Sequence, residues 1–168
     1  MRGGRVQARR VAHDVVIERV QTVDDGVVVA LNRLLPQLSN GARDVTAQAL
    51  REIVEAPGTS LLVARVDGVV VGSVTVVVYA IPSGVYAWLE DVVVDAAARG
   101  AGIGEALVRA ALAEAEALGA RTVDLTSNPS REAAIRLYRR VGFQRRETSV
   151  FRFAGPVADA AGPARRSR

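Results

Sequence analysis

The sequence predicts an α/β fold in which a mixed (α+β) sheet carries helices on its faces. Three observations predict it. Several β-rich runs are bounded by turn residues, two amphipathic helical patterns lie late in the chain, and residues 85–126 follow a strand–helix–strand order. We expect about six to seven strands flanked by four helices, in the order β-α-α-β-β-β-α-β-α-β-β. With 168 residues, 49% of them hydrophobic, the chain suits one domain with one core.

The first part of the chain begins with a weakly alternating run at residues 15–20, which predicts a strand. Asp24 and Asp25 are residues that start helices, so we expect a helix from there to about residue 38. Pro36 lies inside that segment and predicts a kink or break. A second helix is expected over residues 44–55, because its apolar residues recur on one side.

Two β-rich runs at residues 61–66 and 69–79 flank the dipeptide Asp67-Gly68. Asp-Gly between such runs predicts a hairpin with a type I′ turn, because that turn needs positive φ at both central residues. A further turn precedes residues 85–94, which read as the third consecutive strand.

The pattern then changes to helical spacing over residues 103–118, with Gly119 as the expected stop. Residues 122–126 read as a short strand, so segment 85–126 should be a right-handed parallel crossover. A last helix is expected over residues 129–141, with Asn128 as its N-cap and a terminating Gly142.

Two short β-rich segments, 143–144 and 148–153, follow the last helix and are expected to close the sheet. Residues 1–12 and 155–168 read as flexible tails, the first of them rich in arginine, because they hold little to bury. The domain is therefore expected to span residues 13–154.

Composition excludes several kinds of site. The chain has no cysteine, which excludes disulfides, thiolate metal sites and a cysteine nucleophile. With His13 as the one histidine and no G-x-S-x-G sequence, neither a serine triad nor a zinc site is expected. We therefore expect no metal.

Charge and hydropathy bear on partners and location. The net charge is +4 and every basic residue is arginine, yet much of the excess lies in the tails and aromatic residues make up only 4%. Nucleic-acid binding is therefore not expected. No apolar run could span a membrane and no apolar segment follows the first arginines, so we expect a cytoplasmic protein without a secretory signal. Homodimerisation stays open.

The sharpest motif joins a strand to a helix at Arg99-Gly100-Ala101-Gly102-Ile103-Gly104. Glycines allow close approach of the backbone, and the free N–H groups at a helix start suit a pyrophosphate. Tight packing alone is the plainer explanation of such a turn. A P-loop is excluded because it needs lysine, and a dinucleotide fingerprint fits poorly because Glu105 stands at its third glycine position.

With this motif and a second one, L-Y-x-x-x-G-F at residues 137–143, the chain resembles the GNAT (GCN5-related) N-acetyltransferase superfamily over roughly residues 14–153. The resemblance implies a sheet splayed between its fourth and fifth strands, with acetyl-CoA as the cosubstrate in the wedge. It implies that backbone groups of Val92, Val93 and Val94 pair with the pantetheine and that residues 99–104 hold the pyrophosphate. Asn128 matches a family position near the pantetheine arm.

Transfer to an amine needs a base for the amine proton and a donor near the departing sulfur. Tyr138 matches the family tyrosine that serves the sulfur; a half-buried packing tyrosine is the alternative. Glu90 is our candidate base, directly or through water, because a carboxylate inside an apolar strand is unfavourable unless it is partnered or useful. Its alternative is a solvated carboxylate paired with arginine, and Asp91 is a rival base.

The resemblance, together with these candidate residues, thus implies an acetyl-CoA-dependent N-acetyltransferase that transfers directly to a primary amine in a ternary complex. A small-molecule amine is favoured over a peptide or protein amine, and the sequence does not identify it. A non-catalytic CoA-binding regulatory module is the alternative. Arg131, Arg136 and Arg139 are candidates for the 3′-phosphate of CoA, and Trp88 is either an acceptor wall or core.

Overall fold

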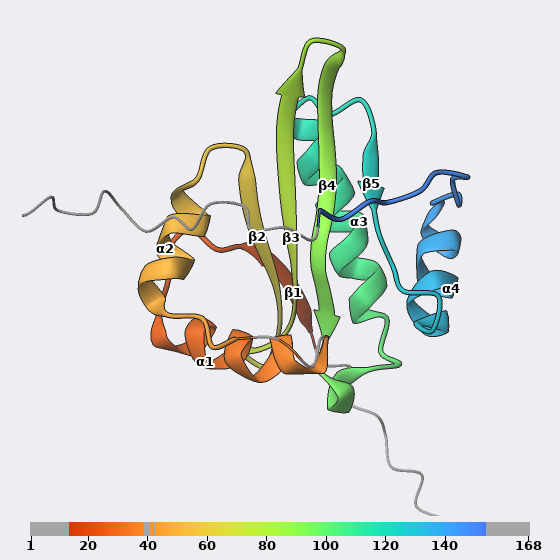
Figure 1. Cartoon of the computed structure of the whole chain (residues 1–168). Coiled ribbons are helices and arrows are strands. Elements are labelled where there is room, and N and C mark those ends of the chain that lie inside the picture. The colour runs from red at the N-terminus through yellow and green to blue at the C-terminus, as the bar shows by residue number, and fades with distance from the viewer. Residues whose placement is uncertain (1–13, 39–40, 42, 154–168) are drawn as a thin grey trace, which may run out of the picture.

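The computed structural model describes residues 14–38, 41 and 43–153, and Figure 1 shows how their elements are arranged. Both predicted tails, 1–12 and 155–168, lie outside the described residues. The elements, in chain order, are β1 (Val15–Arg19), α1 (Asp25–Leu34), the 3₁₀ turn η1 (Leu35–Gln37), α2 (Ala47–Glu55), β2 (Thr59–Val66), β3 (Val69–Ile81), β4 (Gly84–Val94), η2 (Ala96–Ala98), α3 (Ile103–Ala117), β5 (Val123–Leu125) and α4 (Glu132–Val141).

The five strands form one mixed sheet in the order β1-β2-β3-β4-β5. The first four are antiparallel neighbours, and β5 runs parallel to β4 after the crossover through α3. The predicted α/β class with a mixed sheet is therefore confirmed. Asp67 and Gly68 have φ angles of +50° and +81°, which confirms the predicted hairpin turn with two positive φ angles.

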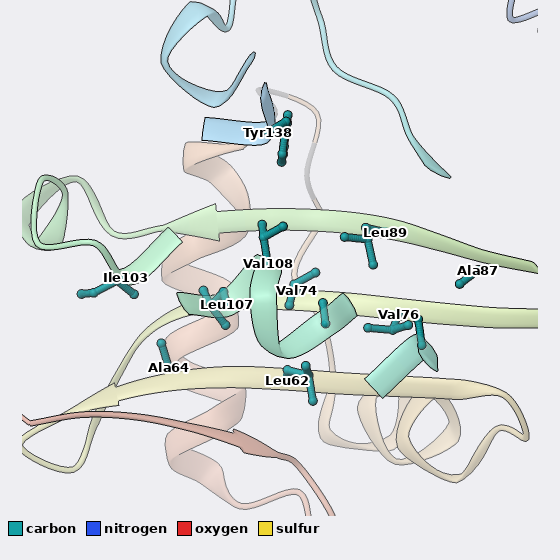
Figure 2. Packing of buried hydrophobic residues seen from close by; sticks show 12 residues of the cluster. Leu62, Ala64, Val74, Val76, Ala87, Leu89, Ile103, Leu107, Val108 and Tyr138 are labelled. Carbon is teal, nitrogen blue, oxygen red and sulfur yellow. The ribbon is translucent and has the colours of Figure 1, made fainter. Parts of the chain in front are cut away.

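Helices cover both faces of this sheet (Figure 1). On one face α3 packs through Leu107 and Val108, whose side chains are fully buried against strands β2 to β4. On the other face α1 and α2 pack over β2 and β3, with Leu34 and Val63 fully buried. Figure 2 shows the first of these clusters, in which Tyr138 of α4 lies beyond the edge of the sheet strands. No helix of the described part is long and apolar enough to cross a membrane.

The expected strand count was too high, because neither 143–144 nor 148–153 forms a strand. Val150, Phe151 and Phe153 are 75%, 92% and 75% exposed. A β-rich sequence becomes a strand only where a partner ladder and a surface to bury against are present. The neighbouring strand β5 has only three residues, so it offers a short ladder.

Two helix starts also differ from the prediction. α2 begins at Ala47 rather than 44, because Thr46 caps it by accepting a hydrogen bond from the Ala49 amide at 3.1 Å. Asn128 is not the N-cap of α4: its Oδ1 accepts from the amide and hydroxyl of Ser130, which builds a local turn before the helix. The ends of α2 and α4 are as expected, with Gly142 in the left-handed conformation after α4. α1 ends at Leu34 rather than about 38, and the 3₁₀ turn η1 holds Pro36 at the predicted break.

Candidate active site

Strands β4 and β5 separate after a short paired stretch. They pair only at Ala87–Val123, Trp88–Asp124 and Leu89–Leu125, while β4 continues to Val94. The edge of β4 that faces away from β3 is therefore open beyond Leu89. The expected splay is present, and it leaves backbone N–H and C=O groups available to a ligand.

A bulge in β4 lies at the point where the strands part. The register with β3 changes from Thr75–Glu90 to Ser73–Val93, so β4 holds one extra residue there. Asp91 takes up the distortion with a φ of +50°. As a result Leu89 faces the α3 side, whereas Val93 packs with the α1 and α2 cluster. The bulge thus redirects the last residues of β4, and it explains why simple alternation misjudges their faces.

Asp91 gives a test of this bulge. We expect Asp91→Val to lower the free energy of unfolding by about 1–3 kcal/mol, because a β-branched residue is strained at positive φ. Asp91→Asn is the matched control and should stay close to the parent, since asparagine tolerates the left-handed region. Thermal unfolding of both variants measures the difference. Equal melting temperatures for the two variants would contradict a left-handed residue at this position.

The glycine-rich turn presents amides at the start of α3. Gly100 and Gly102 have φ angles of +84° and +80°, and Gly102 is the N-cap residue of the helix. The first amides of a helix have no partner inside it, and the helix dipole makes that end positive. Gly102 has no side chain to cap these amides. The turn therefore presents uncapped amides at the place where the sequence predicts a pyrophosphate contact, and that contact stays a prediction.

One cavity of about 810 Å³ joins this turn to the open edge of β4. Its walls come from η1, the end of β4, the glycine-rich turn and the α4 region. The residues singled out from the sequence that line it are Val92, Val93, Val94, Arg99, Gly100, Gly102, Ile103, Gly104, Arg131 and Tyr138. Ala101 is exposed within the same turn but is not part of the wall, and neither are Glu90 and Asn128.

Gly104 sets how closely α3 and α4 approach behind this cavity. A Cβ atom there would lie 2.9 Å from Cδ1 of Leu137, which is closer than carbon atoms normally pack. Both residues line the cavity. The third glycine of the motif therefore serves packing, whereas Gly100 and Gly102 serve the backbone turn.

Charges around the cavity are largely paired. Glu105, in the first turn of α3, accepts hydrogen bonds from Arg140 at 2.8 Å and Arg109 at 2.9 Å. These bonds hold the pKa of Glu105 below its usual value. Arg99 donates from Nε to the carbonyl oxygen of Val94 at 3.1 Å, so its guanidinium is held beside the turn. The negative charge of Glu105, close to the glycine-rich turn, is thereby offset by Arg140 and Arg109.

Two contacts join α1 and η1 to residues 95–96, just before the glycine-rich turn. Arg33 forms an ion pair with Asp95 at 3.2 Å, and Oε1 of Gln37 accepts a hydrogen bond from the Ala96 amide at 2.9 Å. Gln37 also lines the cavity. Sequence reasoning missed Gln37, because nothing in its local pattern reveals a partner 59 positions away.

Tyr138 lies on the inner side of α4 and is only 7% exposed. Its ring meets Phe143 edge to face, with centroids 5.9 Å apart, so the two aromatic residues of the second motif pack together. Burial raises the pKa of the Tyr138 phenol, and the charge of Arg131 opposes that shift. The hydroxyl is therefore protonated at neutral pH and can act as a proton donor.

Glu90 lies on the face of β4 opposite Leu89, just before the bulge. Glu90 is exposed, but partial desolvation raises its pKa and the neighbouring Asp91 carboxylate raises it further, while a hydrogen bond from Trp88 lowers it. A carboxyl group with a raised pKa is a better proton acceptor near neutral pH. The cavity wall reaches Val92 but stops short of Glu90, so Tyr138 is the one of the two candidate catalytic residues that lines the cavity.

Of the arginines considered for a phosphate, only Arg131 lines the cavity, and Arg136 pairs instead with Glu132 at 3.3 Å. Arg140 also lines it and was missed. Arg140 lies three positions after Leu137, another residue of the cavity wall, and this helical spacing is the one signal that could have indicated it. Among the described residues no group of three or more histidine, cysteine or acidic side chains could hold a metal ion.

Comparison with known proteins agrees with this geometry. The model of the acetyltransferase (GNAT) family matches residues 28–143, and the chain belongs to this family. No curated protein matches the chain significantly. The family defines the chain as an N-acetyltransferase with the GNAT fold.

Solved structures have the same fold at low identity. An aminoglycoside acetyltransferase, meta-AAC0020, from an uncultured soil metagenomic sample, is 20% identical with a TM-score of 0.74, over 84% of this chain and 96% of that one. Aminoglycoside N-acetyltransferase AAC(6')-Iy in complex with CoA is 20% identical, TM-score 0.72, over 87% and 98%. Glucosamine-6-phosphate N-acetyltransferase from Arabidopsis thaliana is 18% identical, TM-score 0.71, over 84% and 99%.

Proposed function

We propose that this N-acetyltransferase moves an acetyl group from acetyl-CoA directly to the primary amine of a small molecule. The observation that carries the proposal is the cavity that joins the free amides at the start of α3 to Tyr138 along the open edge of β4. An extended thioester with a pyrophosphate at one end suits a cavity with an anion-binding end and an open strand edge.

Acetyl-CoA is bound mainly by backbone groups, with Arg99 adding a positive charge. The amides of residues 99–104 receive the pyrophosphate, with Arg99 adding charge beside it. The open edge of β4 at residues 92–94 pairs with the pantetheine amides. Asn128 lies just beyond β5 and is assigned to the pantetheine arm by resemblance alone, because its side chain is engaged by Ser130.

In the transfer step the amine nitrogen forms a bond to the acetyl carbon while the carbon–sulfur bond breaks. Glu90 takes the proton that the amine loses, directly or through water, and Tyr138 donates a proton to the departing thiolate. A backbone N–H near Val92 faces the oxygen on which negative charge develops. With no cysteine in the chain, no acyl-cysteine intermediate can form.

The experiment that tests the proposal measures CoA release from acetyl-CoA with a panel of amines, together with CoA binding by calorimetry. Amine-dependent thiol release supports direct transfer. Binding of CoA without release on any amine would favour a non-catalytic CoA-binding module. The absence of binding by well-folded protein would remove the cosubstrate from the proposal.

Variants of Gly102 test more directly whether the amides at the start of α3 contact the pyrophosphate. We expect Gly102→Val to weaken CoA binding by about tenfold or more, because a β-branched residue resists the positive φ that aims the amides. Gly102→Asn is the matched control and should weaken binding less, since asparagine tolerates this region. No atom lies within 4 Å of the Cβ position, so neither variant should clash. Equal affinities for Val and Asn would argue against backbone amides as the phosphate contact.

A further inference from the structure

A row of aromatic and acidic side chains lies on one face of the β3–β4 hairpin. Ala87 and Leu89 pack into the α3 cluster, so the alternating residues Tyr86, Trp88 and Glu90 face the other way. Their partners on β3 are Tyr79, Val77 and Thr75, respectively. Three cross-strand pairs therefore occupy one face, and we call these six residues the hairpin face.

Aromatic side chains dominate the outer part of the hairpin face. The rings of Tyr79 and Tyr86 are stacked, with centroids 6.1 Å apart and planes 27° apart. The Tyr86 hydroxyl is held by the Ser83 hydroxyl at 3.1 Å, so this ring is fixed at the end of the hairpin. Trp88 comes next along β4, and its side chain lowers the pKa of Glu90. Along the hairpin face, the two tyrosine rings are therefore followed by the indole of Trp88 and then by the carboxylate of Glu90.

The helices leave the hairpin face uncovered. α1 and α2 pack over β2 and the start of β3, and within the described residues neither core cluster includes a residue of the hairpin face. Figure 1 shows β3 and β4 projecting well beyond α1 and α2. Tyr79 is 40% exposed, and Tyr86 and Trp88 are half-buried. These aromatic surfaces are therefore accessible to a ligand.

The acidic end of the row carries negative charge that no arginine offsets. Among the residues that the structure describes, no arginine lies within ion-pair distance of Glu90 or Asp91, although Glu18, Glu105, Glu114, Glu132, Asp95 and Asp124 are all paired with arginine. Two adjacent unpaired carboxylates attract a cation, and a cation is the form in which an amine arrives at neutral pH. This end lies next to Val92, where the cofactor cavity begins.

We infer that the acceptor is a primary amine joined by a short linker to an aromatic ring, with the amine at Glu90 and the ring against Trp88. This inference rests on the proposed function, because it assumes that the acetyl group arrives beside Val92. Alternate residues on one strand face lie about 7 Å apart, a spacing that a two-carbon linker and a ring can span. The Tyr79–Tyr86 stack then forms the outer wall for substituents on the ring.

The test compares three acceptors with acetyl-CoA and the full-length protein: 2-phenylethylamine, propylamine and spermidine. The value of kcat/KM for 2-phenylethylamine should exceed that for propylamine by about tenfold or more, mainly through a lower KM. Equal values for these two amines would overturn the inference. A preference for spermidine would also overturn it and point to a polycation read by the carboxylates alone.

Variants of the aromatic residues of the hairpin face test whether the rings select the acceptor. Trp88→Ala should remove most of the preference for 2-phenylethylamine over propylamine, and Trp88→Phe, which keeps a ring, should retain it. Tyr79→Ala changes an exposed residue and should lower the preference by about threefold, which keeps the test valid if Trp88→Ala fails to fold. An undiminished preference in both alanine variants would overturn the inference.

CoA affinity distinguishes the two proposals, because no residue of the hairpin face lines the cofactor cavity. All three variants should therefore bind CoA like the parent. Transfer to propylamine as fast as to 2-phenylethylamine, with CoA bound, rejects only the acceptor assignment. Transfer to none of the three amines with CoA bound likewise rejects only the acceptor assignment. Failure to bind CoA rejects the proposed function and the inference with it.

Discussion

Replacing Tyr138 with phenylalanine is expected to lower kcat by about 100-fold or more, which is the usual scale for loss of a positioned proton donor. The phenol lines the cavity, and burial keeps it protonated by raising its pKa. Phenylalanine keeps the ring and its edge-to-face contact with Phe143 while removing only the hydroxyl. Steady-state kinetics with a saturating amine measures the change.

Two further measurements on Tyr138→Phe keep the interpretation specific. Affinity for CoA and thermal stability should both stay close to the parent, because the ring and its packing are preserved. A fall in kcat that follows a fall in melting temperature would mean that the hydroxyl supports the fold. Unchanged kcat would remove Tyr138 from the chemistry and leave it as a packing residue.

The second large effect is expected at Glu90. Glu90→Gln should lower kcat/KM at neutral pH by about 100-fold or more, because the amide cannot accept a proton. Stability should not fall. Since the folded protein raises the pKa of Glu90, the ionised carboxylate opposes folding as pH rises through that value, and glutamine removes this penalty. Glu116→Gln, an exposed change on α3, is the matched control and should be silent.

The pH profile of kcat/KM adds a signature that a structural role would not produce. Activity should fall as pH decreases through the pKa of Glu90, and this acidic limb should lie at higher pH than an unperturbed glutamate would give. Asp91→Asn removes a charge that raises this pKa, so the limb should move to lower pH. Trp88→Phe removes a hydrogen bond that lowers it, so the limb should move to higher pH. Shifts in the reverse directions would exclude Glu90 as the titrating base.

Local chemistry explains why much of the fold was predictable. Asp67-Gly68 fixes a turn that few other residues adopt, and Gly119 and Gly142 end helices for the same conformational reason. The Arg99–Gly104 turn was placed correctly because glycine spacing and the following helical stripe agree. In each case the residues that make the structure are adjacent in sequence.

The parts that could not be predicted depend on partners far along the chain. The bulge at Asp91 follows from the register against Thr75 and Ser73, which no local pattern encodes. The segment 148–153 has β-rich composition but finds no ladder within the described residues. For the same reason the sequence did not indicate Gln37, which is hydrogen-bonded to the Ala96 amide. Tyr138 was singled out by the family resemblance, and the structure places it in the cavity wall.

The short pairing of β5 has a consequence for how the molecule opens. Only three residue pairs join β5 to β4, whereas β3 is bound along most of its length on both sides. Hydrogen-bonded ladders of such unequal length unfold locally at unequal free energies, and the shorter one gives way first. We therefore expect the β5–α4 unit, which carries Tyr138, to open locally at a lower free energy than β3, while β1 to β4 remain intact.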